Sequence, residues 1–393
     1  MLIPTEEALS RILAEVPTEA VRLPLADCLG LRLAKDVLAE VTSPPDDASA
    51  MDGYAVRFED SCHVGSQLKV IGEAPAGHPF DGEVTEGTAV RAYTGSKIPK
   101  GADHILIQEN AFRNEDTLEV TSAQSKPSHI RKAGIDFNAG DTLLKAGSRL
   151  SPAAIAIAAA GDHADLDVFK RLKVGIIANG DELRRPGDKE ASGDIISSNT
   201  PALSALIRRW GGEPIDLGMA KDDLGSIKAL IDAGSSCDIL LPVGGASVGD
   251  HDHMTDAFEQ MGFGLIFKKV AVRPGKPTWF GKSETQLVLG LPGNPASAYV
   301  CAHLFLKPLL LGKATPPGTA MLIEAISPNG SREHYMRAIQ SEREGVLEIR
   351  PMPLQDSSLL SPFLKANCLL RRLPNADEAN VGDLVETIPL DGA

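Results

Sequence analysis

The sequence predicts a multidomain protein built around an α/β domain with a parallel sheet, with a small β domain on either side of it. The chain has 393 residues, which is more than one ordinary hydrophobic core supports. Short apolar runs alternate with helical patterns between residues 174 and 311, as in right-handed βαβ units. Before and after this region, short alternating segments are separated by glycine-rich turns, which is typical of small all-β domains.

The composition excludes several classes of protein. A net charge of −14 argues against nucleic acid or an anionic membrane as the main partner, although Lys and Arg gathered locally could still hold an anionic small molecule. Five dispersed cysteines without CxxC spacing fit reduced thiols better than a disulfide framework or a zinc site. No signal peptide is recognisable, and no apolar run reaches the roughly 20 residues that cross a bilayer. We therefore expect a cytoplasmic protein.

The part before the central region predicts two helices around a β domain. Thr5 is expected to cap an amphipathic helix with one apolar face. The breaker cluster at 42–47 indicates a domain boundary, and the short strands between 67 and 120 predict a small all-β domain. An alanine-rich helix is expected at 152–160, because proline is favourable in the first helical turn.

The central region alternates strands with helices. The predicted strands are 174–178, 214–217, 239–243, 270–272 and 287–289, and the predicted helices are 201–210, 224–233, 256–261 and 296–311. In a parallel α/β sheet, ligands bind beyond the carboxyl ends of the strands. Residues 179–183 and 244–252 both begin at such ends, so we expect both segments to face a ligand.

Glycines and acidic residues are densest between 238 and 298. The loop 244–249 follows a buried strand, and its glycines allow backbone N–H groups to approach an anion closely. Asp250 and Asp252 come directly after this loop and suit a hard divalent cation that partners a phosphate. A second glycine-rich turn at 290–295 precedes a helical pattern. The sequence therefore predicts a phosphate-binding site that includes a divalent cation.

Cationic side chains gather in the same region. If the segment 269–273 is a strand, its period of two puts Lys269 and Arg273 on one face and two valines on the core face. Lys276 lies in the following loop, whereas Lys268 is expected to be solvated. Because phosphates are anions, cations that converge in this way are expected at a site that binds them.

Seven motifs, taken in order, resemble one known family: MDGYAV at 51–56, TGSKIPKGAD at 94–103, NGDEL at 179–183, ISSN at 196–199, PVGGASVGDHD at 242–252, RPGKP at 273–277 and GLPGNPAS at 290–297. Any one of them is common, but the ordered set covers nearly the whole chain and is highly specific. The chain is similar to molybdopterin molybdenumtransferase, the family of MoeA and the gephyrin E domain. It departs from the usual family pattern at Arg273, where Lys is frequent, and at Asn179, where a hydroxyl residue is frequent.

The resemblance implies a fold of four parts. They are a segmented helical linker or dimerisation domain at 1–43 and 135–168, a β domain at 44–134, an α/β molybdopterin-binding domain at 169–314 that resembles molybdopterin adenylyltransferase, and a C-terminal β barrel at 315–393. Family members are homodimers whose site lies between the α/β domain of one subunit and the β domain and barrel of the other. Further implied partners are molybdopterin adenylyltransferase and molybdoenzyme-maturation proteins.

The resemblance also implies a reaction and its residues. Molybdenum from molybdate enters adenylylated molybdopterin, and AMP leaves in a step that needs Mg²⁺. The implied catalytic residues are Asp52, Thr94, Asp136, Glu182, Asp222, Asp252, Lys269 and Arg273, of which Glu182, Asp222 and Asp252 are the implied Mg²⁺ ligands. The implied cofactor-binding residues are Gly244, Gly245, Ser247, Gly249, Lys276, Pro292, Gly293, Asn294, Arg337 and Ser357.

Structural roles compete with several of these assignments. Asp222 could cap the helix that follows it, and Asp52 and Thr94 could simply belong to turns. Asn294 could stabilise only its own turn, and the hydroxyl of Ser247 could bond to its own backbone. Two other functions also stay open: the adenylyl transfer step itself, and a cofactor-binding or scaffold protein of the same fold without turnover.

Overall fold

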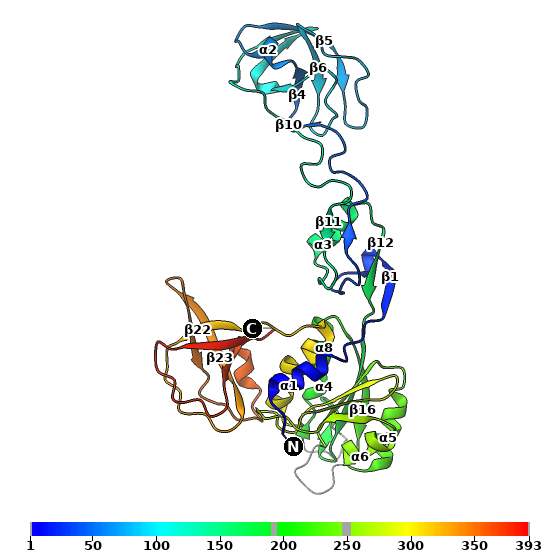
Figure 1. Cartoon of the computed structure of the whole chain (residues 1–393), viewed down its shortest axis with the longest axis vertical. Coiled ribbons are helices and arrows are strands. Elements are labelled where there is room, and N and C mark those ends of the chain that lie inside the picture. The colour runs from blue at the N-terminus through cyan, green and yellow to red at the C-terminus, as the bar shows by residue number, and fades with distance from the viewer. Residues whose placement is uncertain (1, 190–194, 246–252, 392–393) are drawn as a thin grey trace. The chain divides into compact units, whose positions relative to one another are not determined.

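The computed structural model describes residues 2–189, 195–245 and 253–391. It divides into two compact bodies, of which one holds residues 1–19 together with 169–393 and the other holds residues 20–168 (Figure 1). Each body is described separately below. Within the described ranges, every helix is too short or too polar to span a membrane.

A six-stranded sheet forms the centre of the first body. Its strand order is β16 (Glu213–Ala220), β13 (Lys173–Asn179), β17 (Ile239–Val243), β21 (Leu287–Gly290), β20 (Trp279–Lys282) and β18 (Gly264–Phe267). The first four strands are parallel, as predicted. The last two pair in antiparallel fashion and were not predicted, so the expectation of a purely parallel sheet is wrong at this edge.

Helices cover both faces of this sheet, because neighbouring residues of each buried strand point to opposite sides. One core contains the pair partners Ile176 and Leu241 together with α4, α7 and α8, and the other contains Ile177 and Leu240 together with α5 and α6. The helices are α4 (Asn199–Arg209), α5 (Leu224–Ala233), α6 (His253–Gln260), α7 (Pro295–Cys301) and α8 (Lys307–Leu311), with a π-helical turn at Ala302–Leu306 between the last two. This arrangement leaves the carboxyl ends of the parallel strands available for a ligand.

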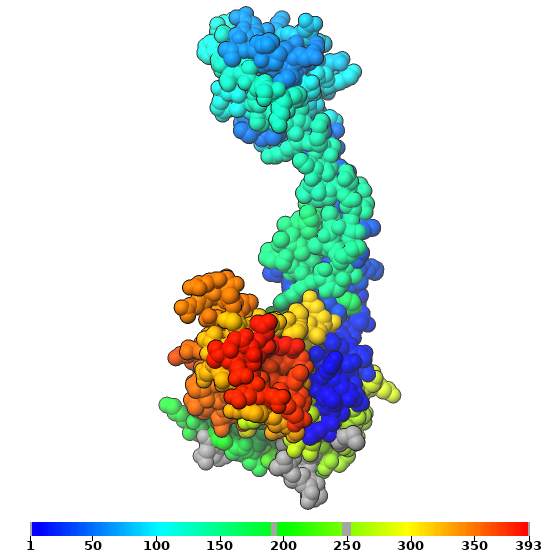
Figure 2. All heavy atoms as spheres, turned by 60° about the vertical axis from the view of Figure 1, so that its left-hand side comes forward, coloured from blue at the N-terminus to red at the C-terminus, as the bar shows by residue number. Residues whose placement is uncertain are grey.

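The N-terminal helix α1 (Thr5–Leu13) lies with this body, although residues 1–43 were expected in the linker domain. Its buried side chains Ala8 and Ile12 belong to the same core as α4 and α8. Figure 2 shows the dark-blue N-terminal segment against the body that carries the red C-terminal strands. Pro4, not Thr5, occupies the N-cap position, and the Thr5 hydroxyl is buried without a hydrogen-bond partner among the described residues, so the predicted cap is wrong.

A closed five-stranded barrel follows the α/β region. It consists of β22 (Gly318–Leu322), β23 (Glu333–Arg343), β24 (Val346–Pro351), β25 (Cys368–Arg372) and β26 (Leu384–Pro389), and the pairing of β23 with β25 closes it. The short strand β19 (Val272–Arg273) pairs with β23 in parallel. The predicted strand at 270–272 therefore joins the barrel sheet and not the α/β sheet. Its alternation is as expected, since Val270 and Val272 are buried and Arg273 is exposed.

The second body contains a β domain and a linker region. The β domain is a six-stranded sheet in the order β7 (His104–Ile107), β4 (Gly53–Val56), β6 (Thr88–Ala92), β5 (Gln67–Ala74), β9 (Thr117–Val120) and β8 (Ala111–Asn114), with a short helix α2 (Phe58–Ser61). In the linker region the chain passes twice, pairing β1 (Ala20–Pro24) with β12 (Asp165–Phe169), β2 (Val37–Leu38) with β11 (Thr142–Leu144), and β3 (Ala48–Ser49) with β10 (Ile130–Arg131). The predicted helix α3 (Pro152–Ala160) packs there, and the Ser151 hydroxyl caps it.

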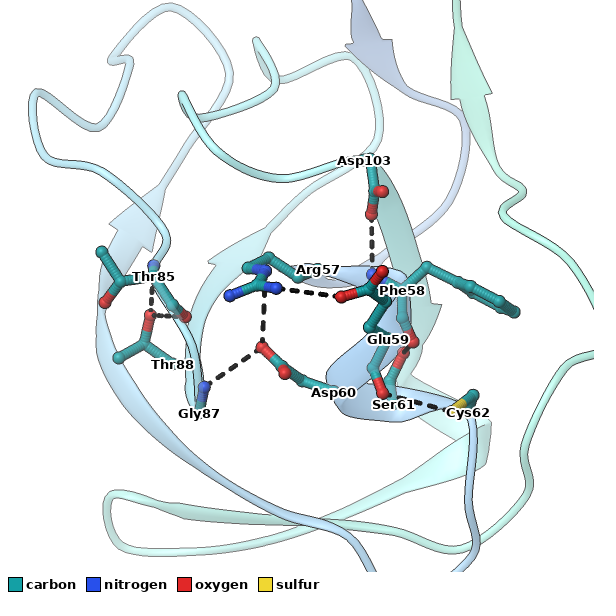
Figure 3. Close-up of polar contacts among 10 residues, drawn as sticks. All are labelled: Arg57, Phe58, Glu59, Asp60, Ser61, Cys62, Thr85, Gly87, Thr88 and Asp103. Carbon is teal, nitrogen blue, oxygen red and sulfur yellow. Dashed lines mark hydrogen bonds and ion pairs between the residues drawn. The ribbon is translucent and has the colours of Figure 1, made fainter.

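Figure 3 shows how α2 is fixed inside the β domain. The backbone N–H of Phe58 donates to a carboxylate oxygen of Asp103 at 2.6 Å. Asp60 accepts the backbone N–H of Gly87 at 3.1 Å, and the Arg57 guanidinium lies 3.9 Å from the same carboxylate. A four-residue helix is too short to be stable alone, so these bonds from two neighbouring loops hold it in place.

Candidate active site

A pocket of about 830 Å³ lies at the carboxyl ends of β13, β16, β17 and β21. Its walls come from the segments that follow these four strands, and the start of α4 closes one side. The lining residues include Asn179, Gly180, Glu182, Asp222, Gly244, Gly245, His253, Pro292, Gly293, Asn294 and Ser358. The sequence therefore correctly placed the residues at 179–183 and 244–245 at one hollow.

Two glycine loops meet at the floor of this pocket. Gly244 has a φ of +94°, and a Cβ built on it would lie 2.7 Å from the carbonyl oxygen of Asn179. A Cβ on Gly293 would lie 3.3 Å from the Cα of Gly244. The N–H of Gly244 is already used, since it donates to the Leu291 carbonyl at 3.1 Å. Gly244 therefore offers no free N–H group to a ligand. Its role is structural, because the absence of a side chain lets the two glycine loops approach each other closely.

Two of the three predicted metal ligands line this pocket. Glu182 follows β13 and Asp222 follows β16, and both side chains are exposed to solvent. The side-chain amide of Asn179 donates to the carboxylate of Asp222, and its own carbonyl oxygen is buried without a partner among the described residues. Asp223, not Asp222, caps helix α5 through a bond from the Ser226 N–H at 2.8 Å. The capping interpretation of Asp222 is therefore wrong, and its carboxylate faces the pocket.

The donors present fit Mg²⁺ better than a transition metal. No cluster of three His, Cys, Asp or Glu side chains close enough to enclose a metal ion occurs in the described ranges. Mg²⁺ does not need such a cage, since it takes one or two carboxylates and completes its octahedron with phosphate oxygens and water. Glu182 and Asp222 are carboxylates of this kind, and both line the pocket. The predicted residues Ser247, Gly249 and Asp252 lie outside the described residues.

A barrel loop forms the opposite side of the pocket. Arg337 on β23 is buried, and its guanidinium donates to the carbonyl oxygens of Leu354, Asp356 and Leu359 at 3.1, 3.0 and 2.9 Å. The loop held in this way carries Ser357 and Ser358. Burial lowers the pKa of Arg337, but the three carbonyls and the Phe363 ring, 5.3 Å from the guanidinium carbon, stabilise its charge. Arg337 is thus a positioning residue.

This loop is tied directly to the second glycine turn. The side-chain amide of Asn294 donates to the Ser357 hydroxyl at 2.9 Å, and the Ala296 N–H donates to the Ser357 carbonyl at 3.0 Å. Ser358 lines the pocket, and both its N–H and its hydroxyl bond to Asp356. Asn294 thus ties its turn to the barrel loop and also lines the pocket, and its predicted role in binding a ligand stays a prediction.

The predicted cations do not share this pocket. Of the lining residues that the structure describes, only Pro277 comes from the segment that follows the basic cluster. Lys269 is exposed, and its carbonyl accepts the N–H of Ile3, while the carbonyl of Lys276 accepts the N–H of Val270. Arg273 lines a different pocket, at the mouth of the barrel. The expectation of one cleft for acids and cations is therefore wrong for Arg273.

Asp52 and Thr94 lie together in the second body. One carboxylate oxygen of Asp52 accepts both the N–H and the hydroxyl of Thr94, at 2.7 and 2.8 Å. The backbone bond and then the hydroxyl bond favour the charged form and lower the pKa of Asp52. Asp136 is exposed, and its N–H donates to the Ser43 carbonyl at 3.1 Å. The pair agrees with the turn interpretation, and its carboxylate is still accessible for other roles.

Three residues that line the pocket had no individual role among the predicted site residues, although the segment 179–183 was expected to face a ligand. Asn179 appeared only as a lost hydroxyl, although its amide orients Asp222. Asn199 at the start of α4 donates its side-chain N–H to the Gly293 carbonyl at 2.7 Å and lines the pocket. His253 also lines it. The position of Asn179 and Asn199 next to a predicted strand or helix end was the signal that could have found them.

Comparison with known proteins decides the family. Three family models match the chain: "MoeA N-terminal region (domain I and II)" at residues 3–161, "Probable molybdopterin binding domain" at 175–312 and "MoeA C-terminal region (domain IV)" at 319–390. The molybdopterin molybdenumtransferase of Haemophilus influenzae is 33% identical over 99% of this chain and 99% of its own length. The chain belongs to the molybdopterin molybdenumtransferase family. The resemblance inferred from the seven motifs is thereby confirmed.

Other relatives of the family agree. The enzyme of the same name from Staphylococcus aureus is 35% identical over 94% of this chain and 91% of its own. The crystal structure of the molybdopterin biosynthesis moeA protein from Pyrococcus horikoshii matches with a TM-score of 0.81 at 29% identity, over 99% of this chain and 100% of that one. The predicted fold class, with its α/β domain, β domain and C-terminal barrel, is confirmed.

Proposed function

We propose that this chain inserts molybdenum from molybdate into adenylylated molybdopterin and releases AMP in a reaction that requires Mg²⁺. The observation that carries the proposal is the pocket at the carboxyl ends of the parallel strands, in a chain that belongs to this family. It combines accessible carboxylates with glycine loops that leave room for a phosphate. A pocket of about 830 Å³ is also large enough for a small-molecule substrate of this size.

The proposed roles follow from the contacts. Glu182 and Asp222, together with Asp252, would hold Mg²⁺, which when bound would offset the negative charge of the substrate phosphates. Asn179 orients the carboxylate of Asp222. Gly244, Gly245, Ser247, Gly249, Pro292, Gly293, Asn294 and Ser357 would surround the substrate, with Arg337 holding the loop of Ser357. Lys269 and Lys276 would attract the anionic substrates to this side of the body.

We also propose that the active protein is a homodimer. In this proposal Asp52, Thr94 and Asp136 of the β domain complete the site of a second copy of the chain. The shared carboxylate of the Asp52–Thr94 pair supports it, because this carboxylate is charged, exposed and rigidly oriented. The proposal otherwise rests on the family resemblance.

An assay of AMP release tests the function. Full-length protein receives adenylylated molybdopterin, molybdate and Mg²⁺, and AMP is measured over time. Asp222→Asn keeps the shape of the side chain but removes its charge, so AMP release should fall at least about 100-fold, because such charge stabilisation is worth several kcal/mol. Glu182→Gln and Asp252→Asn should act in the same direction.

The matched control is Asp223→Asn. Asparagine caps a helix about as well as aspartate, so this neighbouring variant should retain both fold and activity. Normal AMP release by Asp222→Asn would refute its assigned role. Formation of adenylylated molybdopterin from ATP would instead favour the adenylyl transfer step, and substrate binding without AMP release would favour a scaffold.

A further inference from the structure

Three basic side chains stand in one row at the mouth of the barrel. In the parallel pairing of β19 with β23, Arg273 is the partner of His334. In the antiparallel pairing of β23 with β25, His334 is the partner of Arg372. Neighbouring strands are about 4.8 Å apart, and directly paired residues point to the same face of a sheet. The register therefore places the three side chains side by side.

All three side chains line a pocket of about 340 Å³. The remaining wall comes from the loops 324–330 and 351–355 and from Met336. Within the described parts of the chain, none of its lining residues also lines the α/β pocket. The barrel mouth is thus a separate hollow with its own set of charges.

The positive charges in this pocket are not neutralised. Arg372 is 7% exposed, and its Nε is buried without a partner among the described residues, while one terminal nitrogen donates to the Asp377 carbonyl. Neither arginine forms an ion pair in the described ranges. The one carboxylate in the described lining is that of Glu324, which is exposed and also unpaired there. Like charges placed side by side repel, and an unsatisfied buried donor is costly, so a bound anion would relieve both.

The walls of the pocket are rigidly held. The side-chain amide of Asn329 donates to the carbonyls of Arg332, Arg372 and Leu373, which fixes one loop over the hollow. The side chain of Gln355 donates to two carbonyls and accepts the N–H of Arg337 on the other side. Both amides are thereby occupied with the backbone, and the basic row supplies the donors that a ligand would use.

We propose that the barrel mouth binds a small tetrahedral oxyanion between Arg273, His334 and Arg372, at a site distinct from the α/β pocket. The two guanidinium groups are suited to this chemistry, because they donate charge-assisted hydrogen bonds from a fixed geometry, and the neutral imidazole of His334 adds one uncharged N–H donor. The volume fits one oxyanion with its waters better than a nucleotide. The site does not depend on the reaction proposed above, since it shares none of the residues of that pocket.

His334 is expected to report on the bound anion. Burial is the main cause that lowers its pKa to about 4, and the neighbouring charges of Arg273, Arg332, Arg337 and Arg372 act in the same direction. A bound oxyanion would oppose these charges and raise the pKa of His334. The carboxylate of Glu324 also lines the pocket, but it is present with and without the oxyanion and therefore cannot cause this change.

The test is calorimetric titration of the full-length protein with phosphate, sulfate and molybdate in separate runs at constant ionic strength. Arg273→Met and Arg372→Met should each weaken one binding event at least about tenfold, the loss expected for a charge-assisted bond. Arg350→Met is the matched control, since Arg350 is an exposed residue of β24 outside the pocket, and it should bind as the original chain does. Because Arg273 is exposed, its variant should fold even if Arg372→Met does not.

The outcomes separate the sources of the anion. Similar affinity for all three would identify a general oxyanion site, and a clear preference for molybdate would identify a second site for the substrate anion. The proposal is overturned if no oxyanion binds, or if Arg273→Met and Arg350→Met bind equally well. In NMR titrations, the His334 resonance, assigned with His334→Gln, should shift its pKa upward when the oxyanion is present.

Discussion

Replacing Arg337 by methionine tests how the barrel supports the pocket. Arg337 is 3% exposed, and its guanidinium donates to the carbonyl oxygens of Leu354, Asp356 and Leu359. Methionine has a similar length and stays apolar, so the core around it should still pack. The three carbonyls, however, would lose their donors, and the loop that carries Ser357 would be held mainly by its bonds to Asn294 and Ala296.

The expected magnitude follows from these contacts. Three hydrogen bonds from a charged donor contribute roughly 1.5–3 kcal/mol each. Burying the guanidinium cancels a large part of that sum, because desolvation of an ion costs several kcal/mol, and this cost lowers the pKa of Arg337. We therefore expect a net loss of about 2–4 kcal/mol in the local stability of the loop. AMP release should fall as well, because Ser357 and Ser358 would leave their positions at the pocket.

Hydrogen exchange of the backbone amides in residues 352–360 is the suitable measurement, since a chain of several domains need not unfold in one step. A loss of about 2–4 kcal/mol corresponds to protection lower by roughly 30- to 1000-fold, limited by the protection that the loop has at the start. Arg343→Met is the matched control, because Arg343 is exposed at the end of the same strand. Unchanged protection of the loop in Arg337→Met would refute the reasoning.

Two more predictions concern assembly and pH. If each site combines two copies, a mixture of inactive Asp52→Asn and Asp222→Asn proteins should regain AMP release after subunit exchange, and a mixture that stays inactive would contradict the dimeric site. His303 is buried, and burial lowers its pKa to about 4, so the imidazole is neutral at pH 7. Its Nδ1 lies 2.9 Å from the Tyr299 carbonyl oxygen, and its Nε2 lies 3.4 Å from the backbone nitrogen of Asp391. The unfolded chain takes up this proton near pH 6.5, so the free energy of unfolding should fall by up to about 3 kcal/mol between pH 6.5 and 4. In urea titrations His303→Gln should flatten this decrease, and equal slopes for the two proteins would count against it.

The parts of the fold that the sequence predicted are those with local causes. The strand at 239–243 and the helix at 224–233 lie where the apolar patterns predicted them. The strands β18 and β20 were missed, because their pairing along the edge of the sheet depends on partners far away in the chain. For the same reason, the segment 270–272 looked like one more α/β strand, although its partner is a strand of the barrel.

The same distinction applies to the site. Glu182, Asp222 and the two glycine turns could be predicted, because strand ends in a parallel sheet gather at one edge. Their detailed contacts could not. The bond from Asn179 to Asp222 joins residues 43 positions apart, and it depends on the pairing of β13 with β16. The choice between Asp222 and Asp223 as helix cap is a matter of one residue, which sequence patterns do not resolve.

The position of the barrel loop over the pocket has a physical basis in the hydrophobic core. Tyr335, Leu369 and Ile388 of the barrel belong to the same core cluster as the α/β strands and helices. The alternation of β23 then forces Arg337 toward the same side as Tyr335, where its charge is buried and must find carbonyl partners. The loop that supplies these partners carries Ser357 to the bond with Asn294. A barrel without this shared core could not place the loop accurately, so we regard the α/β domain and the barrel as one functional unit.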